Sequence, residues 1–116
     1  MVFFDDLETR SGDERAAELA DILPSQIARA KALGGYKTTL ADITARDITS
    51  ATALAQLPVL RKSVLSQAQG SASPLGGFTT RNVTGFGHIF QSPGPIYEPG
   101  GIEFDWWRMG LSLIHI

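Results

Sequence analysis

The sequence contains no cysteine among its 116 residues. This absence excludes a disulfide framework, a thiolate nucleophile and a cysteine-ligated zinc site, and it fits a reducing cytoplasm. The formal net charge is only −2, so the basic footprint that nucleic-acid binding requires is missing. No apolar run approaches the length of a membrane-spanning helix. We therefore expect neither a nucleic acid nor a membrane as a partner.

The first residues lack the basic leader of a secretory signal, and the stretch 1–8 turns acidic early. We therefore expect a native N-terminus and a cytoplasmic location. The composition itself, with 43% hydrophobic and 19% charged residues, is typical of a small globular domain and carries no signature of disorder.

The first third of the chain has the pattern of amphipathic helix. Ser11 and Glu14 have the spacing of a capping box, which predicts a helix that begins near Asp13. Apolar residues then recur with helical period over residues 16–30. This period predicts one buried face.

Pro24 interrupts that helical pattern. Proline disfavours the helical conformation of the preceding residue and removes one backbone donor, so we expect a break, with Pro24 in the first turn of a second helix. A single kinked helix is the alternative. The glycines in Leu33-Gly34-Gly35-Tyr36 predict a glycine C-cap for the second helix.

The remaining chain predicts shorter elements. Thr49-Ser50 is the expected cap of a short helix over 51–56, and a further helix is expected over 63–69. Residues 70–87 are rich in Gly, Ser, Thr and Pro, which is typical of a surface loop, and one or two short strands are expected near 86–91. The predicted fold class is therefore α+β, mostly short helices with one or two short strands.

The stretch 91–100 contains three prolines and two glycines. These residues restrict the backbone and remove donors, so the stretch predicts a rigid, shaped loop that leaves a short strand. Two nearby side chains are possible ligands. Lys62 is interpreted as a solvated lysine beside a helix N-terminus rather than an anion ligand, and His88 as a structural histidine, since no second ligand or acid partner accompanies it. We predict no catalytic residue and no metal site.

Residues 89–99, followed by Asp105-Trp106-Trp107-Arg108, closely resemble a branch of the phenylacetate-CoA ligase-like proteins, which belong to the acyl-adenylate-forming superfamily. Ordinary members carry a strand here, followed by a phosphate loop that reads Ser-Ser-Gly-Thr-Thr-Gly-Lys-Pro. This chain keeps Ser92, Gly94 and Pro99 of that loop. The resemblance implies that the position of a degenerate phosphate loop comprises Ser92, Gly94, Pro95, Ile96, Tyr97, Glu98 and Pro99.

The departures from the phosphate loop change its chemistry. Such a loop holds phosphate through hydroxyls, backbone N–H groups and a cation. Pro95 has no N–H, Ile96 has no hydroxyl, and Glu98 places a negative charge where phosphate favours a positive one. The resemblance therefore implies the ligase fold more firmly than it implies ATP chemistry.

The last six residues, 111–116, are encoded in one frame by the transposase mosaic-end adapter CTGTCTCTTATACACATC. We therefore expect residues 1–110 to be an incomplete N-terminal region of the large adenylate-forming domain and 111–116 to be a non-native tail derived from the adapter. The missing remainder of the domain would then be the chain's natural partner.

The resemblance implies that the full-length parent activates a carboxylic acid with ATP through an acyl-adenylate, with AMP as the nucleotide product, and transfers it to coenzyme A with Mg²⁺ as the metal. The fragment alone is expected to be inactive and to hold none of these groups. Two alternatives stay open: a divergent, non-catalytic member of the same fold with an altered phosphate loop, and a stand-alone helical interaction module.

Overall fold

The computed structural model describes residues 3, 5–71, 74–80 and 82–101. The predicted helix around Asp105-Trp106-Trp107-Arg108 and the tail 111–116 lie outside the described residues. Within them, three α-helices and a two-stranded antiparallel sheet make an α+β fold, as predicted. Among the described residues no helix combines the length and the apolar character needed to cross a membrane.

The helix α1 (Gly12–Lys31) begins with the predicted capping box. The Ser11 hydroxyl accepts a hydrogen bond from the Glu14 N–H at 3.2 Å, and the Glu14 carboxylate accepts one from the Ser11 N–H at 2.7 Å. These bonds satisfy two donors that a helix start leaves without partners. Hydrogen bonds from the Ser11 N–H and then from its hydroxyl hold the pKa of Glu14 below its ordinary value.

The predicted break at Pro24 is wrong, because α1 continues through this residue. A proline inside a helix costs about 3 kcal/mol. Leu23 and Ile27 lie on either side of it and are both buried, and each buried side chain of this size contributes about 1.5–3 kcal/mol. Burial on one continuous face therefore outweighs the lost hydrogen bond.

The predicted glycine C-cap is also wrong. The helix ends at Lys31, and Ala32 is its C-cap in the right-handed conformation, with its N–H bonded to carbonyls of the last turn. Gly34 instead begins a 3₁₀ helix, η2 (Gly34–Tyr36). The Lys31 ammonium donates to the carbonyls of Ala41 and Ile43, so it ties the following connector back to the helix end.

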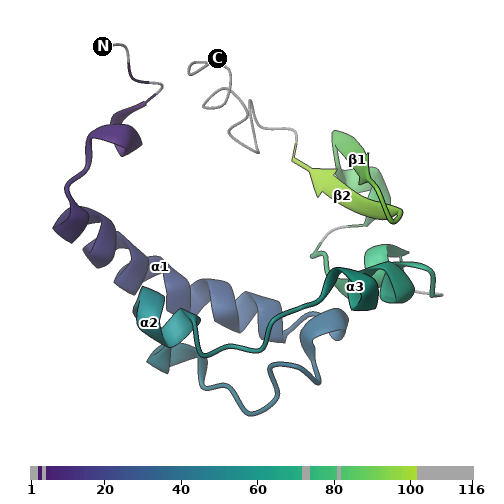
Figure 1. Ribbon diagram of the computed structural model, residues 1–116, viewed down its shortest axis with the longest axis horizontal. Coiled ribbons are helices and arrows are strands. Elements are labelled where there is room, and N and C mark those ends of the chain that lie inside the picture. The colour runs from purple at the N-terminus through teal and green to yellow at the C-terminus, as the bar shows by residue number, and fades with distance from the viewer. Residues whose placement is uncertain (1–2, 4, 72–73, 81, 102–116) are drawn as a thin grey trace.

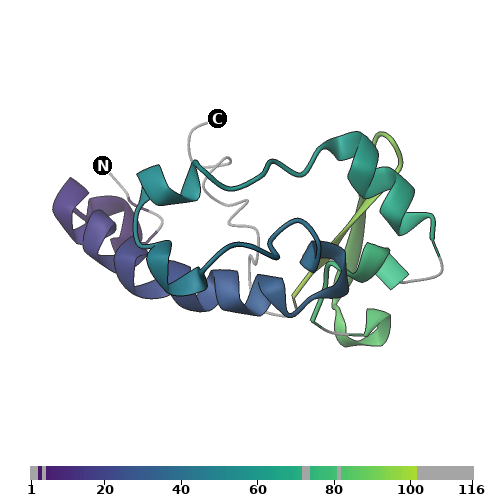
Figure 2. The ribbon, with the colours of Figure 1, turned by 90° about the horizontal axis from the view of Figure 1, so that it is seen from below.

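The apolar face of α1 packs against the connector that follows it. Leu23, Ile27 and Ile48 form the buried centre of this helical cluster. The 3₁₀ helix η3 (Ala45–Asp47) and the helix α2 (Ala51–Leu54) complete it and lie along one side of α1 (Figures 1 and 2). The Ser50 hydroxyl caps α2 as predicted, by accepting from the Ala53 N–H at 3.1 Å, although α2 ends two residues earlier than expected.

The helix α3 (Lys62–Gln69) begins one residue before its predicted start. It packs against the turn segment η4 (Pro74–Gly77) and against the sheet. η4 in turn meets η2, where the rings of Tyr36 and Phe78 stack edge to face with centroids 4.9 Å apart. This aromatic contact joins the helical cluster to the α3 side of the molecule.

The strands β1 (His88–Ser92) and β2 (Ile96–Gly100) form an antiparallel hairpin in which Ser92 pairs with Ile96. The prediction of a loop over 91–100 is therefore wrong for most of its length, since only residues 93–95 form the turn. β1 also begins at residue 88 rather than 86. A proline excludes a strand only where its missing N–H is needed, and Pro99 occupies a position where it is not.

Candidate functional site: the hairpin turn, α3 and the neighbouring cavity

The turn between the strands is closely packed around Gly94. Gly94 has φ 148°, a backbone conformation that favours glycine, and the Gly94–Pro95 peptide bond is cis. A Cβ atom added at Gly94 would lie 3.3 Å from Cγ1 of Ile96 and 3.6 Å from Cε of Lys62. The Lys62 side chain, exposed as predicted, therefore lies along the turn with its methylene groups.

One face of α3 supports the hairpin. Lys62, Ser66 and Gln69 have the spacing i, i+4 and i+7, which places them on one side of a helix. The Ser66 hydroxyl donates to the Pro95 carbonyl at 3.4 Å. The Gln69 amide donates to the Tyr97 carbonyl and accepts from the Tyr97 N–H, both at 2.8 Å. The Gln69 side chain thus bonds to β2 much as a neighbouring strand would.

The structure divides the seven residues of the predicted phosphate loop between different environments. Ser92 ends β1, whereas Gly94 and Pro95 lie in the exposed turn. Ile96 is only 3% exposed, which makes it a core residue rather than a ligand. The remaining three, Tyr97, Glu98 and Pro99, follow in β2 and line a cavity.

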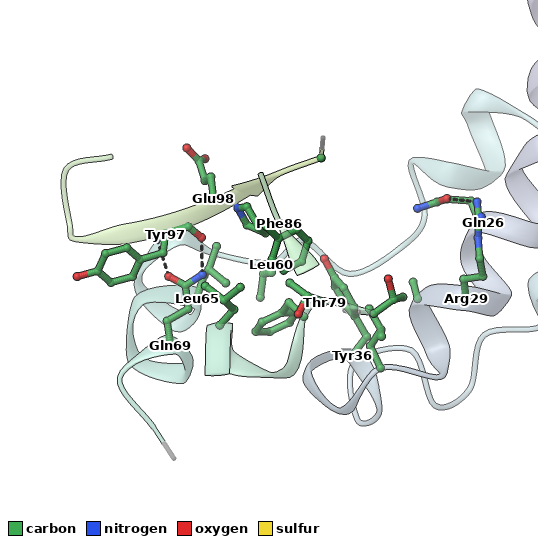
Figure 3. Close-up of a pocket in the computed structure, with 17 residues that line it drawn as sticks. Gln26, Arg29, Tyr36, Leu60, Leu65, Gln69, Thr79, Phe86, Tyr97 and Glu98 are labelled. Carbon is green, nitrogen blue, oxygen red and sulfur yellow. Dashed lines mark hydrogen bonds between the residues drawn. The ribbon is translucent and has the colours of Figure 1, made fainter. Parts of the chain in front are cut away.

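This cavity lies between the C-terminal half of α1 and the hairpin and has a volume of about 660 Å³. Its walls are mostly apolar and aromatic, and Figure 3 shows Leu60, Leu65 and Phe86 gathered beneath β2. No pattern in the sequence predicted this cavity. Its lining comes from segments far apart in the chain, and no local motif marks it. The apolar and aromatic lining residues are Ala30, Leu33, Tyr36, Leu60, Leu65, Leu75, Phe78, Phe86, Tyr97 and Pro99.

Among the described residues that line this cavity, the charged ones are Arg29 and Glu98, and both lie at its rim. Arg29 of α1 lines the side opposite the hairpin, and its guanidinium donates to the side-chain oxygen Oε1 of Gln26 at 2.7 Å. Glu98 lines the hairpin side, but its carboxylate points away from the apolar wall (Figure 3). The volume is within the range of small-molecule pockets, about 300–1,000 Å³. The arrangement suits binding of an apolar body better than proton or group transfer.

The turn does not fit a triphosphate. Of its three residues only Gly94 has an N–H, because Pro93 and Pro95 have none. The neighbouring Ser66 hydroxyl already donates to the Pro95 carbonyl. Glu98 adds an exposed carboxylate on the adjoining strand. A phosphate cradle needs several convergent donors, and this turn presents too few of them.

The remaining candidate side chain, His88, does not line the cavity. His88 begins β1, and its ring stacks on that of Phe90 with centroids 5.9 Å apart. Among the described residues, no three His, Asp or Glu side chains come together in a way that would hold a metal ion.

Comparison with known proteins adds no relative, since no family model, no curated protein and no solved structure matches this chain.

Proposed function

We propose that this chain is the N-terminal region of a phenylacetate-CoA ligase-like protein, in which it has a structural role. The parent would activate a carboxylic acid with ATP through an acyl-adenylate and transfer it to coenzyme A in the cytoplasm. One observation carries this proposal. Ser92 ends a strand and Gly94 follows in a tight turn, which is the strand-then-loop order that the resemblance implies.

The chain alone would not adenylate an acid. Its turn has one backbone donor, and its cavity has a mainly apolar wall with charged groups only at the rim. We therefore derive no step through ATP, Mg²⁺ or coenzyme A on these residues. Detection of acid-dependent pyrophosphate release by the purified chain would contradict this part of the proposal.

The decisive experiment is to sequence the source gene past the codon for Gly110, from a primer within the segment that encodes 1–100. A frame that continues into further adenylation motifs would support the proposal. A stop codon directly after Ile116 would contradict it and would favour the stand-alone interaction module.

The second candidate is a divergent branch of the same fold that has lost ATP chemistry. The burial of Ile96 and the missing donor of Pro95 favour it, because both residues serve the hairpin rather than a ligand. In the full-length parent, the double variant Pro95→Thr with Glu98→Lys should then restore phosphate binding. ATP-dependent activity of the unmodified parent would rule this candidate out.

A further inference from the structure

The two outer edges of the hairpin differ in what covers them. The Tyr97 N–H and C=O both bond to the Gln69 side chain, so they point away from β1. Backbone groups alternate in direction along a strand. The backbone nitrogen and carbonyl group of Pro99 must therefore also point away from β1, which explains why its missing N–H is tolerated. The outer edge of β2 is thus covered by α3 at Tyr97.

The same alternation defines the outer edge of β1. Gln91 pairs with Tyr97 and Ile89 pairs with Pro99. Because the backbone groups of Tyr97 and Pro99 point outward, those of the residues opposite them, Gln91 and Ile89, also point outward, away from β2. Among the described residues, no backbone N–H or C=O group bonds to these four groups. They form a short row of two donors and two acceptors.

This edge lacks the features that protect free strand edges. Natural proteins block such edges with charges, prolines, bulges or a covering element. β1 reads His88-Ile89-Phe90-Gln91-Ser92, so it contains no lysine, acidic residue or proline. Its large side chains are accessible, with Ile89 43% and Phe90 48% exposed. As far as the described residues form it, the edge is therefore open to a further strand.

We propose that the outer edge of β1 pairs antiparallel with β1 of a second copy of this chain, about a two-fold axis at Phe90. In this register Ile89 of each copy lies opposite Gln91 of the other. Each such pair exchanges both of its backbone hydrogen bonds, so all four outward groups of both copies gain partners. The proposal does not depend on the ligase assignment.

A second copy fits this edge on three grounds. The two Phe90 residues would form a pair without backbone hydrogen bonds, where side chains approach most closely and aromatic pairs contribute about 0.2–1 kcal/mol. β1 carries no formal charge that would repel its own copy. Pairing also turns a two-stranded hairpin, which is marginal by itself, into a four-stranded sheet.

The assembly would stop at two copies. A sheet in which both edge strands stay free can associate without limit. An isologous contact through a single edge closes into a dimer. The β2 edge is covered by Gln69 of α3, so of the two described strands only β1 has an available edge. We therefore expect a closed dimer rather than a fibre.

The test is sedimentation equilibrium of the full chain over a concentration series, compared with two variants. Phe90→Lys would place two like charges together at the two-fold axis, and should raise the dimer dissociation constant about tenfold or more. Ile89→Pro would remove an outward donor without removing a β1–β2 bond, and should have the same effect. The matched control is Val59→Lys, at a residue that is 84% exposed and distant in sequence from β1.

A dimer in the unmodified chain and in Val59→Lys, weakened in both edge variants with an unchanged far-UV spectrum, would support the proposal. A monomeric unmodified chain, open-ended aggregates, or a dimer that is unaffected by Ile89→Pro and Phe90→Lys would overturn it.

Discussion

The helical cluster around α1 and the α3–hairpin assembly are held together by different forces. In the helical cluster, Leu23, Ile27 and Ile48 make a small apolar centre. In the α3–hairpin assembly, Ile96 is the buried large side chain, and hydrogen bonds from Ser66 and Gln69 to the backbone attach the helix to β2. The first region depends on apolar burial, whereas the second depends largely on polar contacts.

The two regions should therefore respond differently to substitution. Loss of buried volume costs several kcal/mol because the surroundings relax only partly. Loss of an exposed hydrogen bond costs less, since water replaces the missing partner. We therefore expect the helical cluster to be sensitive to truncation in its core, and the hairpin to be sensitive to single polar substitutions on α3.

The largest effect is expected for Ile27→Ala in the helical cluster. Ile27 is 6% exposed, so its truncation leaves a cavity and should lower the free energy of unfolding by about 2–4 kcal/mol. Urea unfolding followed by circular dichroism measures this. Ile22→Ala is the control on the same helix, because Ile22 is 55% exposed and should change stability by about 0.5 kcal/mol at most. Equal effects would contradict the assigned core.

Gly35→Ala tests the junction between the two regions. A Cβ atom at Gly35 would lie 2.6 Å from the Phe78 ring, so the ring must move, at a cost of about 1–3 kcal/mol. The ring-current shifts that Tyr36 and Phe78 impose on each other should change in NMR spectra. Gly34→Ala is the matched control, since nothing lies within 4 Å of its added Cβ. Unchanged Phe78 signals in Gly35→Ala would refute this packing.

Gln69→Ala should loosen the hairpin without affecting the helical cluster. Two hydrogen bonds to Tyr97 are lost, at a total cost of about 1–2 kcal/mol. Amide hydrogen exchange at Tyr97 should become faster, whereas exchange within α1 should not change. Gln67→Ala on the exposed side of α3 serves as the control. If both variants left exchange at Tyr97 unaltered, Gln69 would have no role in holding β2.

The smallest effect concerns the start of α1 and depends on pH. Because the folded pKa of Glu14 is lowered by hydrogen bonds from Ser11, its contribution to stability is fully present above the ordinary glutamate pKa. It is lost as the pH falls through the lowered value. An NMR titration of the Glu14 carboxyl carbon measures this pKa. In Ser11→Ala the pKa of Glu14 should rise, because the hydrogen bond from the hydroxyl is lost and only the one from the backbone N–H remains. No rise would exclude the hydroxyl as a cause.

Local patterns in the sequence were enough to predict the start of α1, the cap of α2 at Ser50 and the position of α3. Each depends on contacts between residues three or four apart, which a sequence displays directly. The break at Pro24 failed for the opposite reason. The cost of the proline is local and visible, but the burial of Leu23 and Ile27 that offsets it depends on the connector that packs against them.

The candidate site was less predictable than the helices. The stretch 91–100 was predicted to be a loop, and this prediction failed because β2 forms through hydrogen bonds to β1 and to Gln69. The cavity was not predicted, because residues that lie far apart in the sequence, such as Gln26 of α1 and Tyr97 of β2, line it together.

Local sequence was sufficient to predict the α+β class and, to within one residue, the starts of α1, α2 and α3, because caps and periods act over a few residues. Three features depend on the tertiary structure: the burial of Ile96, the strand position of Pro99, and the outward direction of the backbone groups of Ile89 and Gln91. Each of these depends on which segment lies beside it. The identity of the neighbouring segment leaves no mark on the local sequence.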